Sequence, residues 1–208
     1  PRWNSAVKHR SRQRKRQQKS RQDCLFQQNL QKTLRKKTDL MNGREYIQVF
    51  HEFSPVFDEK SKVLILGTFP SVKSREGQFY YHHPQNRFWK VIAALVKEPV
   101  PQTVLEKKEM LLRGHIAIWD VVQSCRIKGS SDSSIRDVVP SDLNQILDHA
   151  DIRKIFANGT TAFRLYRRYC EEKTKREAVC LPSTSPANAS WRLEALTERW
   201  SEEISPFL

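Results

Sequence analysis

Residues 79–90 read FYYHHPQNRFWK and bring together five aromatic side chains, two histidines and one asparagine, without an acidic residue. Aromatic faces stack on nucleobases, and each stacked base contributes about 1–3 kcal/mol. A structural interpretation competes with this one. The Phe-Trp pair begins an amphipathic pattern typical of a core, and Asn86 before it is a preferred helix N-cap residue. Tyr80 and Tyr81 lie among polar residues, so they are the rings that we expect against a ligand.

The histidines and lysines around this segment leave alternatives open. His82 and His83 fit a contact to a phosphate or to a leaving base, and they fit ordinary surface positions equally well. His115 follows a predicted helix end and is interpreted as structural. A Schiff base from Lys73 or Lys90 would need a buried amine, which the local sequence does not indicate, so both are expected to contact phosphates.

Two loops rich in small residues carry possible binding groups. GTFPS (67–71) follows an apolar run but lacks the further glycines and the lysine of a phosphate-binding loop, so a plain turn is favoured on local grounds. PSTSPANAS (182–190) could grip a phosphate with hydroxyls and backbone N–H groups at a helix N-terminus. It could equally be a capped helix start with Asn188 or Ser185 as the cap.

These loops must be positioned by the elements around them. Apolar runs of β-strand type alternate with segments of helical periodicity, which predicts parallel βα units with helices on both faces of the sheet. The predicted strands are 62–67, 116–122, 153–159 and 178–183. The predicted helices cover 87–96, 102–113, 141–150, 160–173 and 189–204.

This order predicts where a site should lie. In open α/β sheets, ligands bind beyond the carboxyl ends of the strands. The loops that follow the four predicted strands are GTFPS (67–71), DVVQSC (120–125), NGTTA (158–162) and PSTSPANA (182–189). We therefore expect all four loops on one edge of the sheet, with the aromatic segment directly after the first.

The charge of the 208-residue chain is concentrated at one end. Residues 1–42 contain 13 Lys and Arg against two Asp, a net charge of +11, whereas the chain as a whole carries +14. Such an arm cannot bury enough apolar surface to fold alone and suits a polyanion such as nucleic acid. We expect one domain over residues 43–208. Met41 is the hypothesised native start, so that residues 1–40 would be dispensable for folding and activity.

Several classes of protein are excluded or disfavoured. No apolar run approaches the length that spans a bilayer, and the N-terminal segment lacks the pattern of a signal peptide, so a cytoplasmic, nucleoid-associated protein is expected if the source is prokaryotic. The four cysteines, Cys24, Cys125, Cys170 and Cys180, show no CxxC spacing, which favours free thiols over disulfides or a metal site.

The loop motifs, taken in order, resemble a known family. KVLILGTFPSVKSREGQFYYHHPQNRFWKVIAAL, IAIWDVVQSC, IFANGTTA and LPSTSPANA are similar to the hypoxanthine-DNA glycosylase (DNA-deoxyinosine glycosylase) branch of the uracil-DNA glycosylase superfamily, over about residues 53–197. HPQNRFWKVI also resembles the mismatch-specific uracil glycosylases. The resemblance implies a three-layer α/β/α sandwich around a four-stranded parallel sheet. It also implies hydrolytic excision of a deaminated base from double-stranded DNA in base excision repair, by a monomer without metal or redox cofactor.

The resemblance also implies roles for residues. Asn86 would be catalytic, with a carbonyl that holds water and an NH2 group that donates to the base. Many superfamily members have Asp or Asn two residues after the first-motif glycine, but Phe69 stands there, so leaving-group stabilisation is expected to dominate. The base-binding candidates are Gly67, Thr68, Phe69, Pro70, Ser71, Tyr81 and His83. The candidates for DNA contact are Ser183, Thr184, Ser185, Pro186, Ala187, Lys73 and Arg87.

Two kinds of rival remain at this point. Within the same chemistry, few residues set base choice, so uracil or xanthine could be preferred over hypoxanthine. From a different class, a non-catalytic nucleic-acid-binding module would also use the basic arm and the exposed rings. A lyase activity through a lysine is a third alternative.

Overall fold

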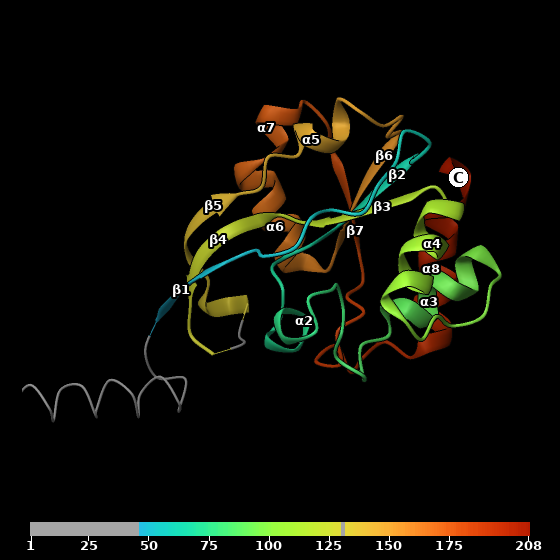
Figure 1. Cartoon of the computed structure of the whole chain (residues 1–208), viewed down its shortest axis with the longest axis horizontal. Coiled ribbons are helices and arrows are strands. Elements are labelled where there is room, and N and C mark those ends of the chain that lie inside the picture. Colours follow the sequence, from blue (N-terminus) through green and yellow to red (C-terminus); the bar gives the residue numbers. More distant parts are fainter. Residues whose placement is uncertain (1–45, 130–131) are drawn as a thin grey trace, which may run out of the picture. The chain divides into compact units, whose positions relative to one another are not determined.

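The computed structural model describes residues 46–129 and 132–208, of which Gln48–Leu208 form a compact unit. The predicted boundary between residues 42 and 43, and the hypothesis about Met41, lie outside the described residues. Figure 1 gives the order of the elements.

A four-stranded parallel sheet forms the centre of this unit. Its strands run in the order β3-β2-β6-β7, and each neighbouring pair is parallel. They are β2 (Val63–Gly67), β3 (Ile116–Asp120), β6 (Lys154–Asn158) and β7 (Ala178–Leu181). The four predicted strands are confirmed, and the chain order of the sheet follows from helical crossovers between parallel strands.

Helices cover both faces of the sheet (Figure 1). On one face lie α3 (Phe88–Val96), α4 (Val104–Arg113) and α8 (Leu193–Ile204), and on the other lies α6 (Thr160–Tyr169). Strand β2 is fully buried because it lies inside the sheet and under both helical layers. Trp200 of α8 and Phe88 of α3 meet edge to face beneath the sheet, with ring centroids 5.9 Å apart. The three-layer α/β/α architecture is thus confirmed.

A second, antiparallel sheet was not predicted. It joins β1 (Ile47–Phe50), β4 (Val122–Ile127) and β5 (Arg136–Pro140) in the order β1-β4-β5. The chain passes from β3 into β4 almost without interruption, because the N–H groups of Val121 and Val122 donate to the carbonyls of Gly67 and Thr68. The sequence 120–125, predicted as a loop, is therefore mostly strand.

The helix predictions were right in number of segments but wrong at several boundaries. The predicted helix 141–150 contains only one short helix, α5 (Asn144–Leu147), and 160–173 divides at Cys170 into α6 and α7 (Glu171–Thr174). The last helix begins at Leu193 rather than at 189, because the preceding residues are held in the loop after β7. A short helix, α2 (Val72–Glu76), was missed.

Candidate active site

A cavity of about 340 Å³ lies at the carboxyl ends of the parallel strands. This volume is at the lower end of the range for small-molecule sites. All four loops that follow these strands contribute to it, as expected from the order of the elements. The predicted site residues that line it are Gly67, Thr68, Phe69, Pro70, Ser71, Tyr81, Asn86, Ser183, Thr184, Ser185 and Ala187.

Tyr81 is held in an unusual backbone conformation at this cavity. Its φ of +49° lies in the left-handed region, which costs a bulky residue roughly 1–3 kcal/mol and is found mainly at functional sites. One face of its ring stacks on Phe88, with centroids 3.9 Å apart and planes 20° apart. Burial, reinforced by the charge of Asp120, raises the pKa of the phenol above its usual value. Tyr81 therefore presents a neutral, firmly backed ring to the cavity.

Gly67 permits a close approach of the side chains above it. A Cβ at this position would stand 2.1 Å from Oδ1 of Asp120 and 3.0 Å from Oη of Tyr81. Any side chain at 67 would displace both groups. The glycine at the end of β2 is thus required for the shape of the cavity, in addition to making a turn.

Asn86 belongs to a hydrogen-bonded chain that crosses the site. Its Oδ1 accepts from the N–H of Phe88 and from Oγ1 of Thr184, at 3.0 Å in each case. Asn158, at the end of β6, donates through Nδ2 to Oγ1 of Thr184 at 2.9 Å and accepts the Thr184 N–H through Oδ1 at 3.0 Å. Since backbone N–H groups can only donate, these bonds set the orientation of both amides.

This chain changes the expected role of Asn86. Its carbonyl oxygen already accepts two hydrogen bonds, one of them at the start of α3 as the N-cap interpretation suggested. The NH2 group is the part of the side chain that remains for a ligand. Thr184, expected to contact DNA, is fully buried, and its hydroxyl links the two asparagines.

Arg87, also expected to contact DNA, holds a loop of the protein. Its guanidinium donates to the carbonyls of Thr184 (3.3 Å), Ser185 (2.6 Å), Asn188 (2.9 Å) and Trp191. Its backbone N–H also donates to the Thr184 carbonyl. One planar cation at the start of α3 thus pins the loop between β7 and α8, with Pro186 and Ala187 exposed at the surface.

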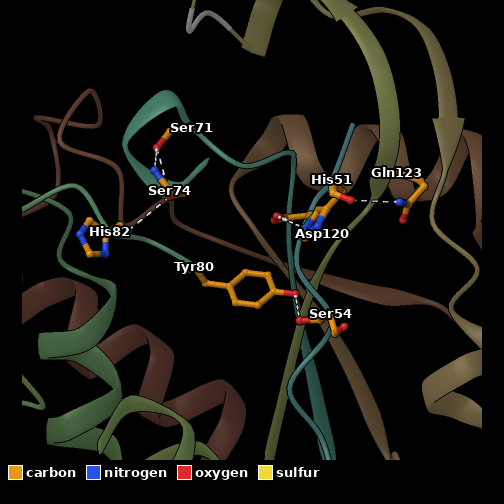
Figure 2. Close-up of polar contacts among 8 residues, drawn as sticks. All are labelled: His51, Ser54, Ser71, Ser74, Tyr80, His82, Asp120 and Gln123. Atoms are coloured by element: carbon orange, nitrogen blue, oxygen red, sulfur yellow. Dashed lines mark hydrogen bonds and ion pairs between the residues drawn. The ribbon is translucent and has the colours of Figure 1, made fainter. Parts of the chain in front are cut away.

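The remaining predicted residues lie around the cavity without lining it. Lys73 is exposed on α2 and pairs with Glu76 at 2.8 Å. His83 accepts the N–H of Gln85 through Nδ1, and His82 is exposed, with its backbone N–H donating to Oγ of Ser74 (Figure 2).

Tyr80, expected in an exposed position, is 2% exposed. Its hydroxyl donates to the Ser54 carbonyl at 3.1 Å (Figure 2). It therefore packs beneath the site more than it presents a free face.

Three cavity residues were missed by the sequence analysis: Asp120, Asp132 and Asn158. Asp120 and Asn158 end strands β3 and β6, so their position at the predicted edge was available as a signal. Asp132 had no such signal, because the second sheet brings it to the cavity. The cavity therefore contains two carboxyl groups, although the first motif supplies none.

Asp120 and Asp132 occupy different environments. Asp120 is 4% exposed and its Oδ2 lies 3.0 Å from Nε2 of His51 (Figure 2). Asp132 as a residue is open to solvent, yet burial of its carboxyl raises the pKa from 3.8 to about 6, opposed by a hydrogen bond from Thr68 and assisted by the charge of Asp120. A carboxyl that titrates near neutral pH is suited to accept a proton from water.

Within residues 46–129 and 132–208, no group of three or more His, Cys, Asp or Glu side chains is arranged to hold a metal ion. In the same part of the chain, no helix has the length and hydropathy to cross a membrane.

The comparisons with known proteins agree with this architecture. The family model of the uracil DNA glycosylase superfamily matches residues 54–204. A hypoxanthine DNA glycosylase of Methanosarcina acetivorans is 34% identical over 140 residues, which cover 65% of this chain and 86% of that protein. A protein of the same name from Methanosarcina barkeri is 31% identical over 109 residues, which cover 51% of this chain and 69% of that protein.

A solved structure is also similar. The solution NMR structure of a proposed uracil DNA glycosylase from Methanosarcina acetivorans has a TM-score of 0.63 and 31% identity, covering 73% of this chain and 93% of that one. The family match includes the parallel sheet, the strained tyrosine, the asparagine network and all four loops of the cavity. The chain belongs to the uracil DNA glycosylase superfamily.

Proposed function

We propose that this protein is a monofunctional DNA glycosylase that removes hypoxanthine from deoxyinosine in double-stranded DNA, acting as a monomer in base excision repair. The observation that carries the proposal is the cavity at the end of the sheet, where the Tyr81 ring and the oriented Asn86 amide meet. The names of the two Methanosarcina relatives support hypoxanthine as the base.

The base must leave the duplex before it can reach this cavity. Extrusion costs a few kcal/mol and is easiest for a mispaired base, which gives hypoxanthine an advantage over normal pairs. Pro186 and Ala187, exposed on the loop that Arg87 holds, are placed to fill the space that the base vacates. A rigid loop suits this task because little entropy is lost when it enters DNA.

Inside the cavity, the base stacks on the face of Tyr81 that Phe88 leaves uncovered. The stack on Phe88 and the strained backbone keep the ring in place before the base arrives. Residues 67–71 supply backbone N–H groups along one wall, except at Pro70, which has none. These groups contact the edge of the base.

Hydrolysis breaks the bond between C1′ and the base nitrogen, and the base leaves with the electron pair. Fixed N–H dipoles aimed at the developing negative charge are the main means of lowering such a barrier. The NH2 group of Asn86 supplies one, and the Thr184 and Asn158 side chains hold it in position. Water attacks the oxocarbenium-like C1′, and the Asp132 carboxylate accepts its proton, which replaces the function that Phe69 cannot perform.

A single gel tests the proposal. Purified protein is incubated with a duplex containing one deoxyinosine, and alkali then cleaves any abasic site. We expect cleavage at the lesion only after alkali, and faster than with matched duplexes containing uracil or xanthine. Uracil belongs in the panel because the similar solution structure carries that name. Binding without abasic sites would contradict the proposal, and a covalent adduct trapped by borohydride would contradict its hydrolytic step.

A further inference from the structure

The neutral polar groups of the cavity offer mainly hydrogen-bond donors. Oδ1 of Asn86 is occupied by two donors, and Oδ1 of Asn158 accepts the Thr184 N–H. Their NH2 groups therefore face a ligand more readily than their oxygens. Hypoxanthine, however, presents a donor, its N1–H, next to the O6 acceptor. A site that reads hypoxanthine needs an acceptor as well as donors, and a carboxylate only accepts.

Asp120 is placed to be that acceptor. Its Oδ2 is engaged by Nε2 of His51, whereas Oδ1 stands over Gly67 on the side of Tyr81. Oδ1 and the Tyr81 Oη both lie within 3.0 Å of the point where a Cβ of residue 67 would stand. A base stacked on the Tyr81 ring extends its edge toward the phenol end of that ring, so Oδ1 lies beside this edge.

His51 and its surroundings hold the carboxylate in place. The His51 ring is 7% exposed and lies edge-on to Phe53, with centroids 4.5 Å apart. Its backbone is fixed from both sides, because its N–H donates to the Gln123 carbonyl and its own carbonyl accepts from Nε2 of Gln123 (Figure 2). The carboxylate is thus preorganised on one oxygen and open on the other, at little further cost on binding.

We propose that Asp120 determines base specificity by accepting the N1–H of the extruded hypoxanthine, with His51 as its positioning residue. The proposal rests on the function proposed above and deepens it. It explains how a normal adenine is rejected: N1 of adenine is an acceptor, and two acceptors facing one another leave both unpaired in a buried site, which is costly. The size and donors of the cavity do not make this distinction by themselves.

The test compares two substrates that differ at this edge. Deoxynebularine carries an unsubstituted purine whose N1 has no hydrogen. Single-turnover excision rates and KM are measured for deoxyinosine and deoxynebularine in otherwise identical duplexes, with wild-type protein, Asp120→Ala and Asp120→Asn. We expect the preference for deoxyinosine over deoxynebularine to fall by about 10- to 100-fold in both variants, the loss typical of a hydrogen bond to a charged group.

The matched control is Asp132→Asn, the same substitution at the more open carboxylate of the cavity. It is expected to lower the rates on both substrates while leaving their ratio at the wild-type value. Thermal denaturation of each variant monitors folding, and the ratio is taken only between substrates on one preparation, so partial unfolding cancels.

Two results would overturn the inference. If Asp120 variants lose both substrates by the same factor, Asp120 only supports the cavity. If the ratio collapses in Asp132→Asn instead, the other carboxylate reads the base. Failure of the proposed function is distinct from either, because wild-type protein would then leave deoxyinosine in place.

Discussion

Asn86 combines a structural and a chemical position in one side chain. Its oxygen satisfies an N–H at the start of α3, which is worth about 1 kcal/mol in helix stability, while its NH2 group remains for the base. The same residue type is therefore favoured for two independent reasons. Activity and stability must be measured separately to tell them apart.

Replacing Asn86 with alanine should lower the excision rate by about 100- to 1000-fold, the loss typical of removing one donor to a developing negative charge. Affinity for a deoxyinosine duplex should stay near wild type, as measured by fluorescence anisotropy. Gln85→Ala, at the exposed neighbouring position, is the matched control. Equal losses of binding and excision would leave Asn86 with its structural role alone.

Thr184 links the two asparagines, so removing only its hydroxyl should disturb both. Thr184→Val keeps the shape but deprives Asn158 Nδ2 of its acceptor and Asn86 Oδ1 of one donor. Unfolding free energy should fall by about 1–3 kcal/mol, because a buried polar group is left unpaired. Urea denaturation and single-turnover excision measure the two effects. Thr184→Ser should restore both, and a fully active valine variant would show that the network does not position Asn86.

The pKa of Asp132 predicts a pH dependence. Because burial raises this pKa to about 6, the carboxyl is largely protonated at pH 5 and ionised at pH 7.5. If the ionised form accepts the proton of water, kcat/KM should rise with pH through about 6 and then level off. In Asp132→Asn the rate should be lower and nearly flat over this interval. A wild-type profile that is flat, or that falls with pH, would contradict the role.

Among the elements, the loop between β7 and α8 depends on α3 for its shape. Arg87 precedes α3 and donates to four carbonyls of this loop, and Gly159 after β6 adds room, since a Cβ there would stand 2.9 Å from Cβ of Ser183. Segments about 100 residues apart in sequence thus form one rigid unit at the edge of the sheet.

Arg87→Lys keeps the charge but cannot reproduce the fork of donors, so the loop should loosen. Hydrogen exchange should accelerate in residues 184–191, and excision should fall more than duplex affinity at low salt. Lys90→Gln on the exposed side of α3 is the control, because it removes a charge without touching the loop. If instead Arg87→Lys is neutral while Arg87→Gln reduces the salt dependence of binding, Arg87 contacts phosphates.

At the scale of the whole molecule, charge separates from catalysis. Residues 1–42 carry a net charge of +11, against +14 for the chain, whereas the cavity belongs to the compact unit that begins at Gln48. A basic segment adds affinity for DNA that depends on salt but not on sequence.

Deleting residues 1–40 should therefore leave excision of deoxyinosine intact at moderate salt, while weakening duplex binding at low salt and reducing its salt dependence. Binding isotherms over a salt series and the alkali assay measure the two properties. Loss of excision at moderate salt would make the segment part of the enzyme.

The amino-acid sequence by itself determined the parallel sheet, its two covering layers and the edge at which the site lies. Apolar runs and helical periodicity are local signals, and the rule that parallel strands end at one edge converts them into a site. The sequence also singled out Tyr81, Asn86 and the loop 182–189 by residue type.

Only the tertiary structure decided how these residues are used. The orientation of the Asn86 amide, the buried links through Thr184 and the use of Arg87 as a loop clamp depend on contacts between segments about 100 residues apart. Likewise Asp132 reaches the cavity through a second sheet that no local pattern announced, since half-exposed antiparallel strands such as β5 carry a weak signal. Hydrogen-bond direction and carboxyl environment are properties of neighbours in space, which sequence order does not specify.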